Sequence, residues 1–135
     1  MFSDVSTIEQ INLHVPNIPG MLARVSDALR SAEINIEAIC CMDRGEASSI
    51  HLILDDIDSA VILLQKIGSV TREPVLAFQE VNKPGAISQI ARACAGGNVN
   101  IRGMYATTYG KKEAMVYVMV DDVEKARAIF TTLVS

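Results

Sequence analysis

The chain carries one sequence pattern twice. Asn17-Ile18-Pro19-Gly20 returns as Asn82-Lys83-Pro84-Gly85, and Ile34-Asn35-Ile36 returns as Val99-Asn100-Ile101, so both motifs recur 65 positions later (17 to 82, 35 to 100). The offset grows by one residue near Gly110, where a hairpin can accept an insertion. A period held over most of the chain indicates two copies of one structural unit, expected at residues 1–72 and 73–135.

The composition narrows the classes of partner. The chain has 12 basic and 16 acidic residues, a formal net charge of −4, and no basic patch interleaved with aromatic residues, which argues against a nucleic-acid partner. No apolar run reaches the roughly 18–20 residues of a membrane span. The N-terminal residues lack the basic and apolar regions of a signal peptide, so we expect a cytoplasmic protein without a membrane partner.

Hydrophobic periodicity predicts the secondary structure of each copy. In the first copy, apolar residues alternate with polar ones in three segments, 8–15, 34–40 and 50–54, which predicts three strands. Apolar residues at helical spacing predict helices at 21–32 and 57–64. The order strand, helix, strand, strand, helix repeats in the second copy.

This order predicts an α+β protein built from two ferredoxin-like βαββαβ units in tandem, each with an antiparallel sheet and both helices on one face. Residues 68–81 must then supply the last strand of the first unit and the first strand of the second, with a turn near 72–74. The second unit is expected to lack its last strand. Its first strand would be an unpaired edge that another chain pairs with or covers, and units this small favour a homodimer.

Few residues suggest catalysis. The chain has no recognisable Ser-His-Asp arrangement, no phosphate-binding glycine motif and no His/Cys cluster, so we expect no enzyme activity, no cofactor and no metal. The pairs Asp55-Asp56 and Asp121-Asp122 could be acid–base dyads. Adjacent residues at a strand end point apart, and Asp directly before a helix is a common cap, which favours the structural interpretation.

The repeated Asn-x-Pro-Gly loop is suited to binding. Gly20 and Gly85 have no side chain, so a ligand can approach the backbone closely. The helix that follows each loop begins with N–H groups that lack intrahelical partners and carry the positive end of the helix dipole, a suitable place for a carboxylate. Asn17 and Asn82 add amide donors and acceptors. The alternative is a plain strand-to-helix turn in which Asn17 bonds its own backbone.

With Asn-x-Pro-Gly followed by two aliphatic residues, and Asn-Ile at the start of the second strand, both copies resemble the ACT domain family. The resemblance implies the ferredoxin-like fold and a regulatory module that binds small molecules, often amino acids, where two such domains meet. In serine-binding members, the loop Asn and the strand Asn both contact the ligand. The ligand-binding residues that the resemblance implies are Asn17, Ile18, Pro19, Gly20, Met21, Leu22, Asn35 and Ile36 in the first copy and Asn82, Gly85, Ala86, Ile87, Asn100 and Ile101 in the second.

Those serine-binding members also carry a histidine two residues before the loop Asn. Here Val15 and Glu80 stand at that position, which argues against serine as the ligand. The negative charge of Glu80 leaves open that the two sites differ in ligand or that only one of them works.

We expect a non-catalytic regulatory module that binds an amino acid. The backbone N–H groups of Gly20, Met21 and Leu22 would hold its carboxylate, and Asn35 would place its polar group. One alternative is a detached regulatory subunit that docks on an enzyme of amino-acid metabolism. A small acylphosphatase-like hydrolase would need an arginine in the first strand-to-helix loop, where residues 16–20 have none and the second copy offers only Lys83.

Overall fold

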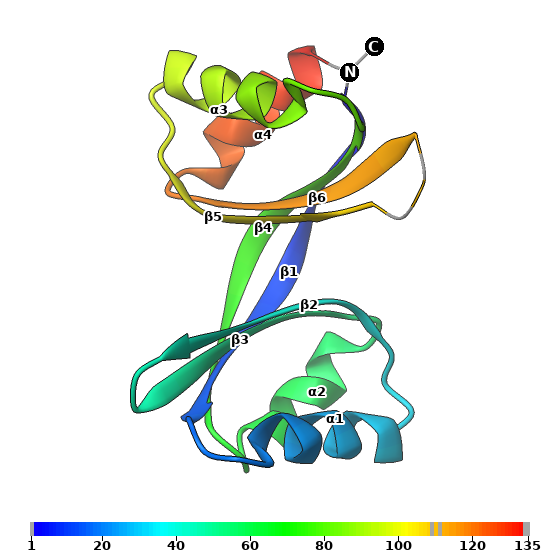
Figure 1. Cartoon of the computed structure of the whole chain (residues 1–135), viewed down its shortest axis with the longest axis vertical. Helices are drawn as coiled ribbons and strands as arrows, with labels where there is room; N and C mark the ends of the chain where they lie inside the picture. The colour runs from blue at the N-terminus through cyan, green and yellow to red at the C-terminus, as the bar shows by residue number, and fades with distance from the viewer. Residues whose placement is uncertain (1, 109, 111, 134–135) are drawn as a thin grey trace. The chain divides into compact units, whose positions relative to one another are not determined.

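The computed structural model describes residues 2–108, 110 and 112–133. Strands and helices alternate in the order that the periodicity predicts, so the α+β tandem of ferredoxin-like units is confirmed (Figure 1). The elements are β1 (Phe2–Pro16), α1 (Met21–Ser31), β2 (Ile36–Arg44), β3 (Ala47–Leu54), α2 (Ile57–Leu64), β4 (Ser69–Val81), α3 (Ala86–Gly96), β5 (Ile101–Thr107), β6 (Glu113–Val120) and α4 (Val123–Thr132).

Two long strands, β1 and β4, take part in both compact units of the chain. One unit holds residues 9–73, and the other combines residues 1–8 with 74–135. The strands form one sheet in the order β2-β3-β1-β4-β6-β5. The first unit contains β2, β3 and the parts of β1 and β4 within residues 9–73. The second unit contains β5, β6 and the remaining parts of β1 and β4. The turn expected near 72–74 is wrong, because β4 continues through these residues as one strand.

The missing fourth strand of the second unit comes from the start of the chain. Within that unit, Ser6 Oγ donates a hydrogen bond to the Ala77 carbonyl oxygen at 3.4 Å. The ring of Phe2 packs edge-on against Phe78 and Phe130, with centroid distances of 5.2 and 5.1 Å. The unpaired edge expected for this unit is therefore wrong: residues 2–8, placed in the first domain from the sequence, cover it.

Each unit has its own core between one sheet face and two helices. In the unit of residues 9–73, fully buried aliphatic side chains from β1, α1 and β3 fill this space, among them Ile11, Leu29 and Leu52. In the other unit, Phe78 and Phe130 lie at the centre of the core. Figure 1 shows α1 and α2 on one face of the strands of the first unit, and α3 and α4 on one face of the strands of the second.

The four helices begin in two different ways. At the start of α2, Asp56 Oδ1 accepts a hydrogen bond from the Ser59 backbone N–H at 3.2 Å, and Asp122 caps α4 in the same way through Lys125 at 3.1 Å. The cap interpretation of these aspartates is confirmed. Helices α1 and α3 follow a left-handed glycine and have no side-chain cap. The backbone N–H of Met21, expected to hold a ligand carboxylate, instead donates to the Ile18 carbonyl oxygen at 3.4 Å, and that of Ala86 donates to the Lys83 carbonyl oxygen at 3.2 Å. The N–H groups of the next two residues of each helix have no intrahelical partner.

Candidate functional site

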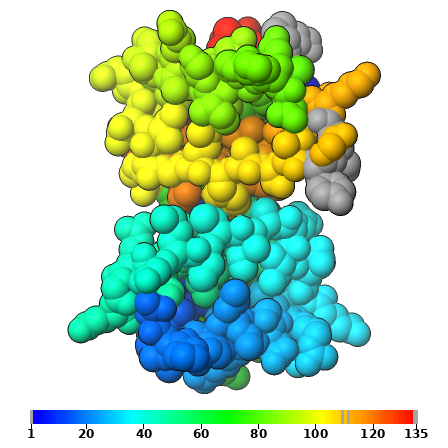
Figure 2. Space-filling view, in the orientation of Figure 1, coloured from blue at the N-terminus to red at the C-terminus, as the bar shows by residue number. Residues whose placement is uncertain are grey.

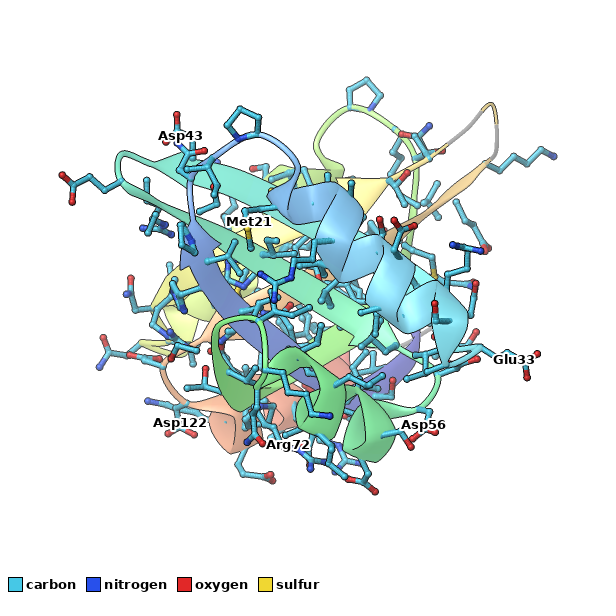
Figure 3. All side chains as sticks on the ribbon, turned by 90° about the horizontal axis from the view of Figure 1, so that it is seen from below. Met21, Glu33, Asp43, Asp56, Arg72 and Asp122 are labelled. Carbon is cyan, nitrogen blue, oxygen red and sulfur yellow. The ribbon has the colours of Figure 1, made fainter. Side chains whose placement is uncertain are left out.

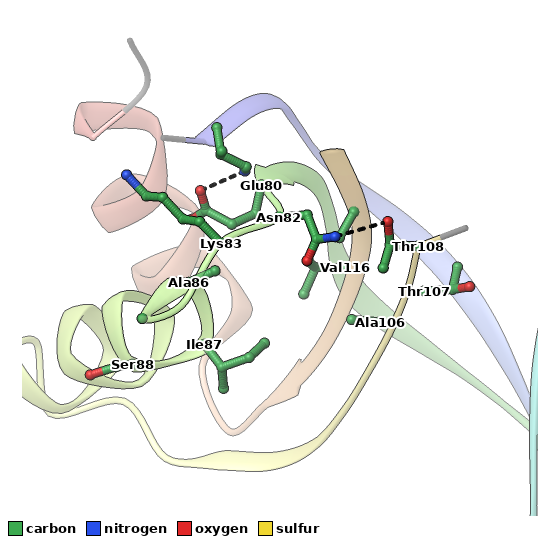
Figure 4. Close-up of a pocket in the computed structure, with 13 residues that line it drawn as sticks. Glu80, Asn82, Lys83, Ala86, Ile87, Ser88, Ala106, Thr107, Thr108 and Val116 are labelled. Atoms are coloured by element: carbon green, nitrogen blue, oxygen red, sulfur yellow. Dashed lines mark hydrogen bonds between the residues drawn. The ribbon is translucent and has the colours of Figure 1, made fainter. Parts of the chain in front are cut away.

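A pocket of about 320 Å³ lies beside the second Asn-x-Pro-Gly loop. The end of β4, the loop, the first turn of α3 and strands β5 and β6 form its walls (Figure 4). Four of the six second-copy residues expected to bind a ligand line it, whereas Asn100 and Ile101 do not. The lining residues are Glu80, Val81, Asn82, Lys83, Gly85, Ala86, Ile87, Ser88, Ala106, Thr107, Thr108, Ala114 and Val116.

The pocket combines a buried carboxylate with an uncapped helix start. Glu80 is 1% exposed, and its Oε1 accepts a hydrogen bond from the Val81 backbone N–H at 2.8 Å. Gly85, with φ of 92°, leads into α3, which has no side-chain cap. The exposed Lys83 adds a positive charge on the loop. Residues of both charges therefore line one small pocket, and Figure 4 draws the Lys83 side chain extending from the loop away from Ala106.

In the first copy, the loop asparagine is used to hold the loop itself. Asn17 Nδ2 donates hydrogen bonds to Asp43 Oδ1 and to the Gly45 carbonyl oxygen, both at 2.8 Å, and Asn17 Oδ1 accepts one from Ser48 Oγ at 3.2 Å. Both donors and the acceptor of this amide therefore bind the β2–β3 hairpin. This arrangement favours the structural interpretation of Asn17, with the hairpin rather than its own backbone as partner.

The hairpin residues that hold Asn17 are replaced in the second copy. Thr108 stands where the first copy has Asp43 (43 to 108), and Ala114 stands where it has Ser48 (48 to 114). The amide of Asn82 makes a long hydrogen bond to Thr108 Oγ1 at 3.4 Å. Both replacements line the pocket, so an uncharged threonine and a single methyl group border the space beside the second loop where the first copy has an aspartate and a serine.

Two further differences lie at the helix start. Met21 is the first residue of α1 and is 8% exposed, with its side chain in the core of its unit (Figure 3). Its counterpart Ala86 has no side chain beyond Cβ and borders the pocket. The buried Val15 is likewise replaced by the carboxylate of Glu80. At these two positions the first copy has buried apolar side chains, and the second copy has a carboxylate and a single methyl group.

The second repeated asparagine lies at the far end of each first helix. Asn17 precedes α1 and Asn35 follows it, and a helix of 11 residues is about 16 Å long. Asn35 therefore lies too far along α1 to meet a small ligand held at Gly20, Met21 and Leu22 of the same unit. A ligand that contacts both kinds of asparagine needs the second one from another unit.

Asn35 and Asn100 are held in place by the first aspartate of each repeated pair. The backbone N–H of Asn35 donates to Asp55 Oδ1 at 2.9 Å, and its carbonyl oxygen accepts from the Asp55 N–H at 3.3 Å. Asn100 and Asp121 make the same two bonds at 3.0 and 3.1 Å. These reciprocal bonds fix the start of β2 and β5, which gives the aspartates a structural role.

The family follows from a match to nearly the whole chain. Residues 6–133 match the family model described as an ACT domain pair. The chain belongs to the family of ACT domain pairs. ACT domains are regulatory and non-catalytic modules, which favours the regulatory interpretation over a small hydrolase.

Solved structures share the fold of this ACT domain pair. Protein BT0572 from Bacteroides thetaiotaomicron has a TM-score of 0.87 at 22% identity, covering 96% of this chain and 90% of that one. The ligand-free regulatory subunit of aspartate kinase from Thermus thermophilus has a TM-score of 0.72 at 20% identity, covering 98% and 96%. That subunit from Thermus flavus has a TM-score of 0.65 at 20% identity, covering 96% of each chain. No curated protein matches the chain.

Several pocket residues of the second ACT unit were not expected from the sequence. Ala106, Thr107, Thr108 and Ala114 belong to the β5–β6 hairpin, which the loop motif does not include. The signal that could have found them is the comparison of the two hairpins position by position, since their polar residues differ where their apolar pattern agrees.

Of the first-copy residues expected to bind a ligand, Ile18 and Leu22 have exposed side chains, at 57% and 46%.

A candidate metal-binding group of side chains and a candidate membrane-spanning helix are both absent from the described part of this ACT domain pair. Among residues 2–108, 110 and 112–133, no group of three or more His, Cys, Asp or Glu side chains is placed to hold a metal ion. Within the same residues, every helix falls short of the length and apolar character of a membrane span.

Proposed function

We propose that the chain is a non-catalytic regulatory module that binds an amino acid in the pocket of its second ACT unit. The observation that carries the proposal is the buried carboxylate of Glu80 in a pocket that also contains the uncapped start of α3. An amino acid carries one positive and one negative group a short distance apart. The pocket offers one partner for each, whereas the matching space of the first unit offers the apolar side chains of Val15 and Met21.

The charges of the pocket define how the ligand lies. Its ammonium group donates to the carboxylate of Glu80, which can accept several hydrogen bonds at once. Its carboxylate accepts from the backbone N–H groups of Ile87 and Ser88 in the first turn of α3, with Lys83 adding positive charge. Hydrogen bonds to charged groups contribute about 1.5–3 kcal/mol each, so these contacts can orient a small ligand.

Regulation requires that the ligand bind two arrangements of the protein with different affinity. The pocket wall includes β5, an edge strand of its sheet, and Figure 2 shows the residues of β5, in yellow, at the surface. A second copy that pairs along this edge would close the pocket and could bring a strand asparagine to it. We therefore propose a homodimer whose pairing the amino acid strengthens, which sedimentation with and without ligand tests.

Calorimetry against each common amino acid tests the binding itself. We expect one or a few to bind, and ligand at about 100 times its dissociation constant to add about 2.7 kcal/mol to the free energy of unfolding. The variant Ala86→Met introduces the side chain that fills the first unit, and Glu80→Gln removes the charge, so both should abolish binding. Ala95→Met, an exposed change on the same helix, is the matched control. Binding that survives in Ala86→Met, or no heat with any amino acid, would contradict the proposal.

A second candidate is a detached regulatory subunit that docks on an enzyme of amino-acid metabolism. It is favoured by the likeness to structures described as regulatory subunits of aspartate kinase, which cover nearly the whole of this chain. Affinity purification of the tagged chain from its native source tests this candidate. Recovery of a catalytic chain in fixed ratio would support it, and recovery of the chain alone would oppose it.

A further inference from the structure

We infer that the pocket beside Gly85 selects an amino acid with a branched aliphatic side chain, such as valine. This inference rests on the proposed function, because it concerns the part of the pocket that remains once the main-chain charges of the ligand are placed. That remainder is bounded by side chains of α3, β5 and β6.

The ammonium and carboxylate groups of the ligand main chain pair with both charged side chains of the pocket. Among the described lining residues, Glu80 and Lys83 are the ones with an ionisable side chain, one of each sign. Glu80 takes the ammonium group, and Lys83 with the start of α3 takes the carboxylate. A charged side chain on the ligand would move from water into a pocket with no remaining group of opposite charge to pair with it, at a large cost in free energy. This argues against lysine, arginine, aspartate and glutamate.

The wall that faces the ligand side chain is apolar. Val116, 1% exposed, belongs to the core of its unit and also lines the pocket, so the core side chains extend to the pocket surface. Ala106 and Ala114 carry a single methyl group each and leave room beside it. Ile87 is 47% exposed, and an aliphatic ligand would remove part of that apolar surface from water.

Asn82, Ser88, Thr107 and Thr108 are the described lining residues with a polar uncharged side chain, and three of them already make hydrogen bonds within the protein. Ser88 Oγ accepts from Arg92 Nε at 3.3 Å. Thr108 Oγ1 accepts from the Asn82 amide and donates to the Glu113 carbonyl oxygen, both at 3.4 Å. A volume of about 320 Å³ lies near the lower end of the range for ligand pockets, about 300–1,000 Å³, and suits a small ligand. The pocket therefore favours methyl groups over a hydroxyl in a side chain of valine size.

Valine and threonine have nearly the same shape, so calorimetry with both on the full chain tests the inference. We expect valine to bind about 10- to 100-fold more tightly than threonine, the discrimination typical of an apolar pocket against an added hydroxyl. Threonine that binds as tightly as valine overturns the inference and leaves the proposed function standing. Absence of binding by every amino acid overturns the proposed function as well, so the two failures are distinguishable.

A variant locates the selectivity on β5. Ala106→Asp introduces a carboxylate into the apolar wall at an exposed position, and should weaken valine at least about tenfold while strengthening lysine. Cys41→Asp makes the same change at the matching exposed position of the first unit (41 to 106) and should leave valine affinity as it is. Ala106→Ser serves if the aspartate variant does not fold, and should weaken valine in the same direction. Unchanged valine affinity in the folded Ala106 variant overturns the inference.

Discussion

A methionine in one unit and an alanine at the matching position of the other decide how much space lies beside each repeated loop. Met21 packs into the core of its unit, whereas Ala86 borders a pocket. The sequence showed the difference but not its consequence, because whether a side chain at a helix start turns inward depends on packing. The role of Asn17 also needed the structure, since its partners come from a hairpin about 30 residues away.

The thiols of Cys94 and Cys41 lie in different surroundings, so we expect them to react with a thiol reagent at different rates. Cys94 is 1% exposed, and burial, together with the negative charge of Asp121, raises the pKa of its thiol. Cys41 is exposed on β2. Because the thiolate is the reactive form, Cys41 should be labelled by a thiol reagent in the native protein and Cys94 only after unfolding. Peptide mapping by mass spectrometry measures this, and labelling of Cys94 at the rate of Cys41 would show that the core is open.

The stability of the chain should fall in mild acid through His51. Burial, then the positive charges of Arg44 and His14, lowers the pKa of His51 below its usual 6.5. The unfolded chain therefore binds the proton more readily, so the free energy of unfolding decreases as pH falls through about 6.5 and levels off below the folded pKa. His51 Nδ1 also lies 2.8 Å from Asn12 Oδ1 and 3.3 Å from Gln10 Nε2.

The variant His51→Gln removes this contribution. Urea denaturation at about pH 7.5 and about pH 5.5 gives the free energy of unfolding of both proteins, and the advantage of the natural chain should shrink at the lower pH. A difference between the two proteins that does not change with pH would show that His51 titrates alike in the folded and unfolded states.

Among the elements, helices, hairpins and the last strand of the first unit followed from the sequence, but the fourth strand of the second unit did not. Each hairpin joins neighbours in sequence, so local pattern predicts it well. The partner of the segment 74–81 lies at residues 2–8, with Ser6 and Ala77 separated by 71 positions in the sequence. Asp4, with φ of 53°, interrupts the alternation there. Phe2 and Val5, three positions apart, both contact the core as a result. A pattern of period two cannot reveal such a strand.

The N-terminal strand should therefore stabilise the unit that contains the end of the chain. Phe2→Ala removes a ring that packs on Phe78 and Phe130, and should lower the free energy of unfolding by about 3–5 kcal/mol. Ile62→Ala, on a 64% exposed side chain of the other unit, is the control and should cost well under half of that. Thermal unfolding followed by circular dichroism measures both, and equal small losses would place residues 2–8 outside the folded core.

For the whole molecule, two units with one fold differ in the residues beside their repeated loops. The repeat and its loop motif were enough to predict the family and the tandem fold. They could not show how the two loops differ, because the motif is equally complete in both copies. The difference lies in Val15 and Met21 of the first copy against Glu80 and Ala86 of the second. The second unit offers charge and space, and the first offers a filled core around a loop held by its hairpin.

The most direct test of this division is a crystal of the chain soaked in a mixture of the common amino acids and inspected for density beside Gly85 and Gly20. We predict density for one amino acid beside Gly85, with its ammonium group at Glu80 and its carboxylate at the start of α3, and none beside Gly20, where Met21 fills the space. Density beside Gly20 alone, or no density beside either glycine at a concentration that binds in solution, would contradict the account.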